Sequence, residues 1–255
     1  MSITGDRLRN LETLEDPKPA LATARHLALP MLRGMWNFAS VDNTGAIYDM
    51  SEQDRTLTYN GNPVFDNNDL VPYATLDGVG DYFSRADEAG LDITGTETYV
   101  EATKRGVSLG GWFYLTDITA SRGLIGKWAS PANRSYLLWF SFGALAFQFS
   151  VSAGGAVIVS SPSTVTPTTG EWHFIAGTFD PSATMNIYVG NVKTTLAAGV
   201  PANAFSGNGP FEIGSRDGGL IPLIGSASYC WLCASFLSDA HISGIYQNTR
   251  ALFGV

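Results

Sequence analysis

The stretch GEWHFIAGTFDPSATMNIYVGN, residues 170–191, decides the fold class. Its first half alternates, so Trp172, Phe174 and Ala176 fall on one face of an extended strand and the residues between them fall on the other. Asp180-Pro181-Ser182 is a turn signal, because these residue types favour the backbone conformations of tight turns. A second alternating apolar run follows the turn. The stretch therefore predicts an antiparallel β-hairpin.

The same hairpin contains residue types that act together in many active sites. His173 lies in the middle of the first predicted strand, whereas Asp180 lies at the turn. At about 3.3 Å per residue, more than 20 Å of strand separates them. The two side chains therefore do not form a catalytic pair, and we expect His173 to be a hydrogen-bonded residue of the sheet.

Short apolar runs separated by turn residues continue through the chain from Gly34 onward. Turn signals occur at Asn60-Gly61, near Pro131 and at Gly154-Gly155. The 255 residues include 28 glycines and 12% aromatic residues but only 15% charged residues, a composition of strands and turns rather than of helical bundles. These features predict an all-β protein, a two-sheet antiparallel jelly-roll sandwich.

Charge, hydropathy and cysteine content exclude several classes of function. The formal net charge is −8 and the sequence has no basic stripe, so we expect no nucleic-acid partner. No run approaches the ~20 apolar residues of a membrane-spanning helix, so we expect no membrane insertion. Cys230 and Cys233 lie in an apolar strand-like run, where residues three apart point to opposite faces. They are expected to be structural thiols, because no second Cys or His pair completes a zinc site.

Residues 1–33 differ from the rest of the chain and are expected to form an extended N-terminal arm with short helical turns, followed by a jelly-roll domain at 34–255. The arm gathers apolar side chains in a segment too short to hold a core. We expect it to contact copies of the same chain or another protein, the alternative being a poorly ordered terminus. Its scattered charges do not match a signal peptide. The expected assembly contacts are Leu8, Leu11, Leu14, Leu27 and Leu29.

Seven motifs in order resemble the laminin G-like, concanavalin A-like jelly-roll domains found in bacteriophage structural proteins and bacterial surface proteins. The resemblance covers residues 34–250 and implies two curved antiparallel sheets, face to face. The hairpin at 170–191 is one of the motifs. The other six are GMWNFASVDNTGAIYDMS (34–51), YATLDGVGDYFSR (73–85), VSLGGWFYL (107–115), GLIGKWASPANRSYLLWF (123–140), PFEIGSRDGG (210–219) and GSASYCWLCASFLSDAHISGIY (225–246).

Some proteins of this family are glycosidases, and others hold one structural calcium. The glycosidases carry paired acids on one strand, but here Glu171 and Glu212 stand alone and no strand carries such a pair. We therefore expect no catalytic residues. The family's calcium motif on the closing strand lacks its acids in this chain. The loop residues Asp42, Asn43 and Asp49 remain as candidate calcium ligands, although all three are also common turn formers.

Other members of the family bind sugars through exposed aromatic side chains that stack on the sugar ring. Trp112 and Trp172 are expected to be core residues, whereas Trp36 and Trp231 are weaker candidates for exposure. Trp128 lies beside the turn signals near Pro131 and is the strongest candidate. The candidate ligand-binding residues are Trp128, Tyr136 and Trp139, with packing in the core as the alternative for each.

Three classes of function follow from these observations. The first is a non-catalytic virion structural protein, a bacteriophage capsid decoration or tail component whose jelly roll contacts other proteins or host-surface glycans. Such a protein would be cytoplasmic until assembly and released by lysis. The alternative is a carbohydrate-binding module of a bacterial surface protein. A glycoside hydrolase is the third class, which the missing acid pair disfavours.

Overall fold

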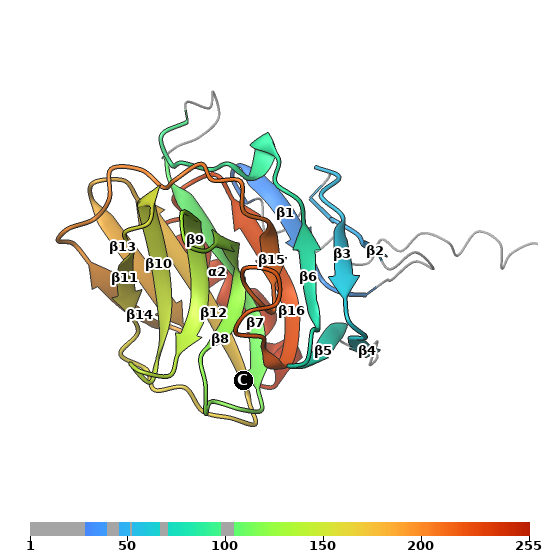
Figure 1. Cartoon of the computed structure of the whole chain (residues 1–255). Helices are drawn as coiled ribbons and strands as arrows, with labels where there is room; N and C mark the ends of the chain where they lie inside the picture. Colours follow the sequence, from blue (N-terminus) through green and yellow to red (C-terminus); the bar gives the residue numbers. More distant parts are fainter. Residues whose placement is uncertain (1–28, 40–45, 52, 67–70, 98–104) are drawn as a thin grey trace, which may run out of the picture.

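The computed structural model describes residues 29–39, 46–51, 53–66, 71–97 and 105–255. Two β-sheets lie face to face (Figure 1). The candidate residues Leu8, Leu11, Leu14, Leu27, Asp42 and Asn43 lie outside the described residues.

Sheet A contains eight strands, all paired antiparallel. They are β1 (Leu32–Trp36), β4 (Val64–Asp66), β5 (Tyr73–Asp77), β7 (Val107–Leu115), β12 (Trp172–Asp180), β13 (Thr184–Val189), β14 (Val192–Leu196) and β16 (Ile224–Cys233). The order is β14-β13-β12-β7-β16-β5-β4, and β1 pairs with β16. Some neighbouring strands, such as β7 and β16, are far apart in the chain but pair in the middle of the sheet.

Sheet B also contains eight antiparallel strands. They are β2 (Ala46–Ile47), β3 (Leu57–Asn60), β6 (Tyr82–Arg85), β8 (Arg122–Ala129), β9 (Asn133–Ser141), β10 (Ala146–Gly155), β11 (Val159–Pro162) and β15 (Phe211–Ile213). The order is β11-β10-β9-β8-β15-β6-β3-β2. The helical elements are short: η1 (Ala89–Leu91), α2 (Asp239–Thr249) and η2 (Arg250–Phe253). The predicted all-β jelly-roll sandwich is confirmed.

The hairpin predicted from residues 170–191 is β12 and β13, paired from Ile175–Val189 to Asp180–Thr184. Its two faces separate as the alternation predicts. Ile175 belongs to the core between the sheets, whereas Phe174 belongs to a second cluster on the other side of sheet A. His173 is 8% exposed, and its Nε2 lies 2.9 Å from the carbonyl oxygen of Thr168. It is the hydrogen-bonded sheet residue that the sequence predicts.

The core between the sheets is made of aliphatic and aromatic side chains from both layers. Burying this surface is the main driving force for packing the two sheets. A buried cation anchors one end of the core. The Nζ of Lys127 on β8 is fully buried and lies 2.7 Å from Asp87 and 2.8 Å from Asp92, so the loop before β7 is tied to sheet B.

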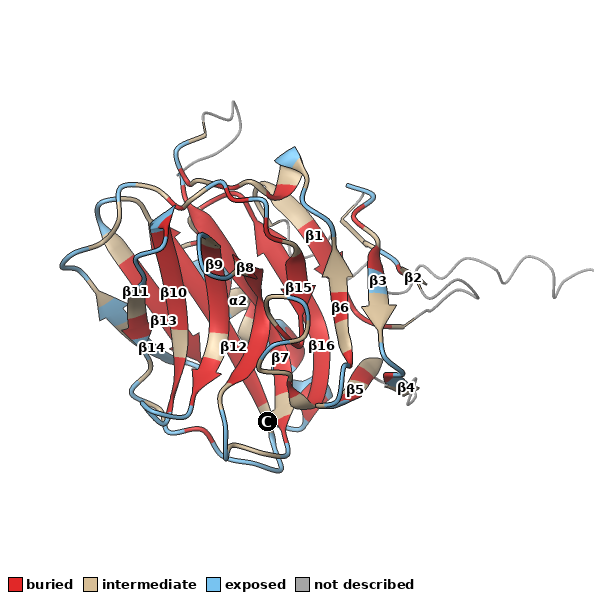
Figure 2. Ribbon diagram, viewed as in Figure 1, coloured by how far each residue is buried: buried red, intermediate tan, exposed pale blue. Residues whose placement is uncertain are grey.

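The outer face of sheet A is covered by the C-terminal segment. Figure 2 shows β7, β12 and β16 buried along almost their whole length. Trp112 on β7 stacks on Phe253 of η2, with ring centroids 4.2 Å apart, and its Nε1 donates a hydrogen bond to Thr249 at the end of α2. Ile242 and Ile245 of α2 complete this second cluster. The central strands of sheet A are therefore buried on both faces.

The two cysteines lie on opposite faces of β16, as expected. Cys230 faces the core between the sheets and Cys233 faces the second cluster, and both are free thiols. Burial raises the pKa of each thiol well above its ordinary value, which keeps both in the unreactive protonated form.

The first strand begins slightly before the expected domain boundary. β1 starts at Leu32, so the last two residues of the expected arm belong to sheet A. Leu29, one of the expected assembly contacts, packs against the second cluster of its own chain. In the part of the chain that the structure describes, no helix is long and apolar enough to cross a membrane.

We predict that Trp112→Ala lowers the free energy of unfolding by about 3–5 kcal/mol, because it leaves a large cavity under η2. Equilibrium unfolding in urea, followed by fluorescence and circular dichroism, measures the change. The control is Val79→Ala at an exposed turn position, which should change stability by less than about 0.5 kcal/mol. A cost below about 1 kcal/mol for Trp112→Ala would show that the C-terminal segment is not firmly packed on sheet A.

Candidate functional site

Two of the three aromatic candidates for ligand binding, Trp128 and Tyr136, are buried, so packing in the core holds for both and they are not exposed ligand contacts. Tyr136 is fully buried in the core between the sheets and donates a hydrogen bond to the carbonyl of Leu91. Trp128 is only 2% exposed, although it lies beside the turn at Pro131. Of the weaker candidates, Trp36 and Trp231 are buried as well.

Trp139 is the one predicted aromatic candidate that is partly exposed. On β9, Tyr136 and Leu138 face the core, so Trp139 points outward from sheet B. Its Nε1 donates a hydrogen bond to Ser150 on β10, which in turn bonds to Ser160 on β11. These bonds hold the indole ring in place across three neighbouring strands.

A turn after β15 covers part of the outer face of sheet B. Arg216 and Leu220 pair with each other through two backbone hydrogen bonds, and we call residues 216–220 the covering turn. Gly218 and Gly219 have φ angles of +72° and +102°, which favour glycine. In Figure 1 the chain after β15 crosses in front of the strands of sheet B.

Three hydrogen bonds fix the covering turn to the sheet. The N–H of Asp217 donates to the carbonyl of Trp128 on β8, and the Oδ2 of Asp217 accepts a bond from the N–H of Ser130. The N–H of Gly218 donates to the Oε1 of Glu212 on β15 at 2.8 Å. The turn therefore has a defined position on the sheet, and it helps to bury Trp128.

The covering turn places an arginine over the exposed tryptophan. The guanidinium carbon of Arg216 lies 5.9 Å from the centre of the Trp139 ring, a cation–π distance. A second arginine is near: Arg134 at the start of β9 donates hydrogen bonds to the Ala156 carbonyl and to the Ser130 hydroxyl. Burial lowers the pKa of Arg216 and the Arg134 guanidinium lowers it further, while Asp217 opposes both.

Glu212 is the residue of this face that the sequence analysis set aside as isolated. It lies between Phe211 and Ile213, which face the core, so its side chain points to the outer face of sheet B. It is only 1% exposed. Burial raises the pKa of Glu212 to about 7; the hydrogen bond from Gly218 opposes this shift and Asp217 adds to it. The signal that marks it in the sequence is an acid alternating with two large apolar residues.

Buried polar atoms without a partner are concentrated on this face. Apart from the Asp92 oxygen that pairs with Lys127, nine buried side-chain N and O atoms of the described residues have no hydrogen-bond partner in the protein. Buried polar groups are normally satisfied, so such a cluster points to water or a ligand. Six of the nine lie on the outer face of sheet B or in the covering turn: Trp128 Nε1, Arg134 Nε, Ser135 Oγ, Ser152 Oγ, Glu212 Oε2 and Arg216 Nε.

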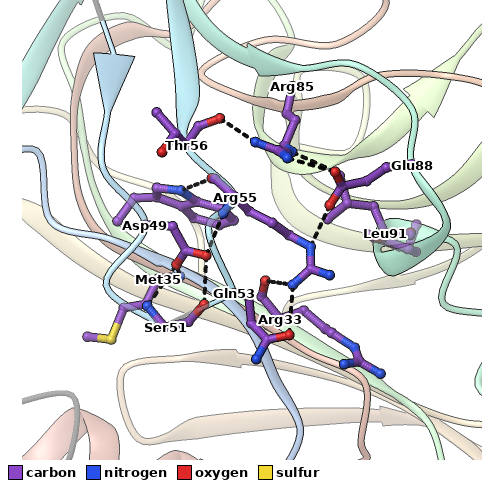
Figure 3. Close-up of polar contacts among 12 residues, drawn as sticks. Arg33, Met35, Asp49, Ser51, Gln53, Arg55, Thr56, Arg85, Glu88 and Leu91 are labelled. Atoms are coloured by element: carbon purple, nitrogen blue, oxygen red, sulfur yellow. Dashed lines mark hydrogen bonds and ion pairs between the residues drawn. The ribbon is translucent and has the colours of Figure 1, made fainter.

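The candidate calcium ligand Asp49 has a different set of partners. Its carboxylate accepts hydrogen bonds from the N–H groups of Met35, Ser51 and Arg55 and from the hydroxyl of Ser51 (Figure 3). Within the described ranges, no three His, Cys, Asp or Glu side chains come together as a metal site. Since Asp42 and Asn43 are not among these residues, the calcium site stays a prediction.

Figure 3 also shows why the sequence around Asp49 is rich in charged and polar residues. Arg55 is 8% exposed and donates hydrogen bonds to Glu88, to Gln53 and to the carbonyl of Arg33. Glu88 also pairs with Arg85 on β6. The network ties β1 of sheet A to β6 of sheet B, which is a structural role.

We predict that replacing Glu212 by Gln makes stability less dependent on pH. The folded-state pKa lies above the ordinary value of 4.5, so the contribution of Glu212 to stability is full below pH 4.5 and is lost as the pH rises through 7. Relative to the wild type, Glu212→Gln should therefore gain up to about 3 kcal/mol between pH 4.5 and pH 8.5. Urea unfolding at both pH values measures this, with Asp54→Asn at an exposed position as control. If the difference in stability between Glu212→Gln and the wild type is the same at both pH values, the pKa of Glu212 is not raised in the folded protein.

Solved structures with the same fold include toxin binding domains and a domain of an arabinanase. The binding domain of Paraclostridial Mosquitocidal Protein 1 matches 86% of this chain, with a TM-score of 0.65 and 9% identity. The binding domain of botulinum neurotoxin serotype D matches the same share, with a TM-score of 0.63 and 11% identity. The match spans 52% of the length of each of these two domains, so this chain corresponds to about half of each.

Domain 4 of AbnA, an extracellular arabinanase from Geobacillus stearothermophilus, was solved in complex with arabinotriose and matches over nearly its whole length. The match covers 85% of this chain and 98% of that domain, with a TM-score of 0.59 and 14% identity. At such low identities these structures establish the fold alone. No functionally curated protein has significant sequence similarity to this chain.

The family is shown by the sequence itself. The family model Laminin_G_3, described as the concanavalin A-like lectin/glucanases superfamily, matches residues 88–242, more than half of the chain. The matched residues include β7 to β13, β15 and β16, and therefore every strand that contributes to the covering turn and the Trp139 face. The chain belongs to the concanavalin A-like lectin/glucanases superfamily.

Proposed function

We propose that this chain is a non-catalytic recognition domain that binds a saccharide on the outer face of sheet B. The observation that carries the proposal is Trp139, a partly exposed aromatic ring held in place on a sheet face. Aromatic faces pack against the apolar faces of sugar rings, and nearby polar side chains bond the hydroxyl groups. Gln148, directly opposite Trp139 on β10, and Ser160 on β11 supply such groups.

The carboxyl groups of this face favour binding over hydrolysis. A glycosidase uses two carboxyl groups that flank the scissile bond, about 5–10 Å apart. Here the Oδ2 of Asp217 accepts the N–H of Ser130, and Glu212 is almost completely covered. With Glu212 covered, this face does not present the two accessible carboxyl groups that a glycosidase needs, which supports a non-catalytic role.

The solved structures with the same fold add support. Their descriptions name binding domains, one of them a botulinum neurotoxin DC domain in complex with SialylT, and an arabinanase domain with arabinotriose. Domains with this fold thus occur in complexes with saccharides, which supports the proposal for this chain. The ligands named are those of the other proteins.

We also propose that the domain acts in a bacteriophage virion, as a capsid decoration or tail component, rather than in a bacterial surface protein. The support is the resemblance to phage structural domains together with the leucine-rich segment at residues 1–33. In that setting the outer face of sheet B contacts host-surface glycans, and the N-terminal segment contacts other virion proteins or copies of the chain. The domain would leave the host by lysis.

We predict that deleting residues 1–28 reduces self-association while leaving the sandwich folded, because β1 begins only at Leu32. Light scattering after gel filtration gives the mass of the assembly, and circular dichroism checks the fold. Leu29 is retained because it packs on its own sandwich. An unchanged mass, together with equal incorporation into particles, would remove the support for the assembly role.

The saccharide proposal predicts that Trp139→Ala lowers affinity for the bound saccharide at least tenfold, because the stacking surface is lost. A glycan array identifies the ligand, and isothermal titration measures the affinity. Trp139→Phe should retain part of it. The control is Phe142→Ala, which removes an exposed aromatic side chain from the turn between β9 and β10. If the wild type binds no saccharide, the proposed function is wrong.

A further inference from the structure

We propose that the saccharide is acidic, and that Arg216 and Arg134 bind its carboxylate or sulfate group beside Trp139. This inference rests on the proposed saccharide-binding function and specifies the chemical class of the ligand. Three features of the two arginines point to an anionic ligand: the way in which they are held, the charges around them, and the partners that they lack.

Arg216 is held at a defined place without an anionic partner. The covering turn is fixed by hydrogen bonds to Trp128, Ser130 and Glu212, so the arginine that it carries has little freedom of position. In the described part of the chain, the Arg216 guanidinium makes no ion pair and its Nε has no hydrogen-bond partner. A held guanidinium that lacks a partner is prepared to bind a ligand, because less side-chain freedom is lost on binding.

Arg134 is also without an anionic partner. Its two terminal nitrogens donate to neutral oxygens, the Ala156 carbonyl and the Ser130 hydroxyl, and its Nε is buried without a partner. Five other cations of the described residues differ in this respect. Those in ion pairs are Arg55, Arg85, Arg122, Lys127 and Lys193.

The two guanidinium groups are close enough to repel each other. The charge of Arg134 contributes to lowering the pKa of Arg216, which requires proximity. Ser130 also connects the two residues: Arg134 donates to its hydroxyl, and its N–H donates to Asp217, the neighbour of Arg216 in the chain. Two like charges held together on one face are unfavourable without an anion, and a bound carboxylate or sulfate would offset this repulsion.

The nearby acids do not neutralise this pair fully. Asp217 supplies one carboxylate, which also accepts a hydrogen bond from the N–H of Ser130. Burial raises the pKa of Glu212 to about 7, so at neutral pH this carboxyl carries only part of a negative charge. The face therefore carries a local excess of positive charge within a chain of net charge −8. A general attraction between the protein and an anion is thus absent, and the attraction must be local.

The unpartnered atoms of this face match an acceptor-rich ligand. Trp128 Nε1, Arg134 Nε and Arg216 Nε are obligate donors, and the two serine hydroxyls can donate as well. Carboxylate and sulfate oxygens only accept hydrogen bonds at neutral pH, whereas a neutral sugar offers hydroxyl groups that also need acceptors. An arginine fork beside an aromatic ring thus fits a ligand with an anionic group on an apolar sugar face.

The experiment compares matched acidic and neutral saccharides with the full chain. An array pairs sialylated, uronate and sulfated glycans with counterparts that lack the anionic group, and titration follows the best ligand at 50 and 300 mM NaCl. We expect at least tenfold preference for the acidic member, and weaker binding at high salt. Arg216→Gln and Arg134→Gln should each reduce acidic-ligand affinity roughly 10- to 100-fold. Arg216→Lys, which keeps the charge but not the fork, should recover only part of it.

The controls separate this inference from the proposed function. Arg250→Gln removes an exposed arginine at the far end of α2 and should leave affinity unchanged. Circular dichroism and urea unfolding confirm that each variant is folded. Equal binding of acidic and neutral saccharides, with loss in Trp139→Ala but not in Arg216→Gln, would overturn the acidic-ligand inference and leave saccharide binding intact. Absence of binding to every saccharide would overturn the proposed function itself.

Discussion

Burial of the central strands of sheet A on both faces is the constraint on which the rest of the structure depends. One face packs against sheet B, and the other is closed by α2 and η2 through the stacking of Trp112 on Phe253. Strands such as β7 and β16 are therefore buried at nearly every position. On the other layer, the outer face of sheet B presents the partly exposed Trp139.

The covering turn converts that face from a flat sheet into a site with defined chemistry. Backbone hydrogen bonds fix the turn, so Arg216 lies over Trp139 and Glu212 is shielded from water. Both effects leave polar atoms without partners in the protein, which costs free energy that a bound ligand or ordered water recovers. A site of this kind trades stability for binding, which is common where function depends on preorganised groups.

The candidate residues show where reasoning from sequence succeeds and where it ends. Trp139 was identified because aromatic residues on strands are frequent sugar contacts. The same reasoning selected Trp128 and Tyr136, but local turn signals do not reveal that distant segments bury them. Glu212 was dismissed because it has no acidic neighbour in the chain. Its character comes from burial, and Asp217 and Gly218 act on it through a turn that folds back over the strand.

The sequence by itself determined the all-β class, the β12–β13 hairpin, the opposite faces of Cys230 and Cys233, and the sheet role of His173. These features depend on the two-residue period of a strand and on turn residues, which are local properties. Only the tertiary structure decided that the C-terminal segment packs on sheet A and that Arg216 lies over Trp139 on sheet B. The physical reason is that antiparallel sheets pair strands far apart in the chain, and no local pattern records which face a distant segment will cover.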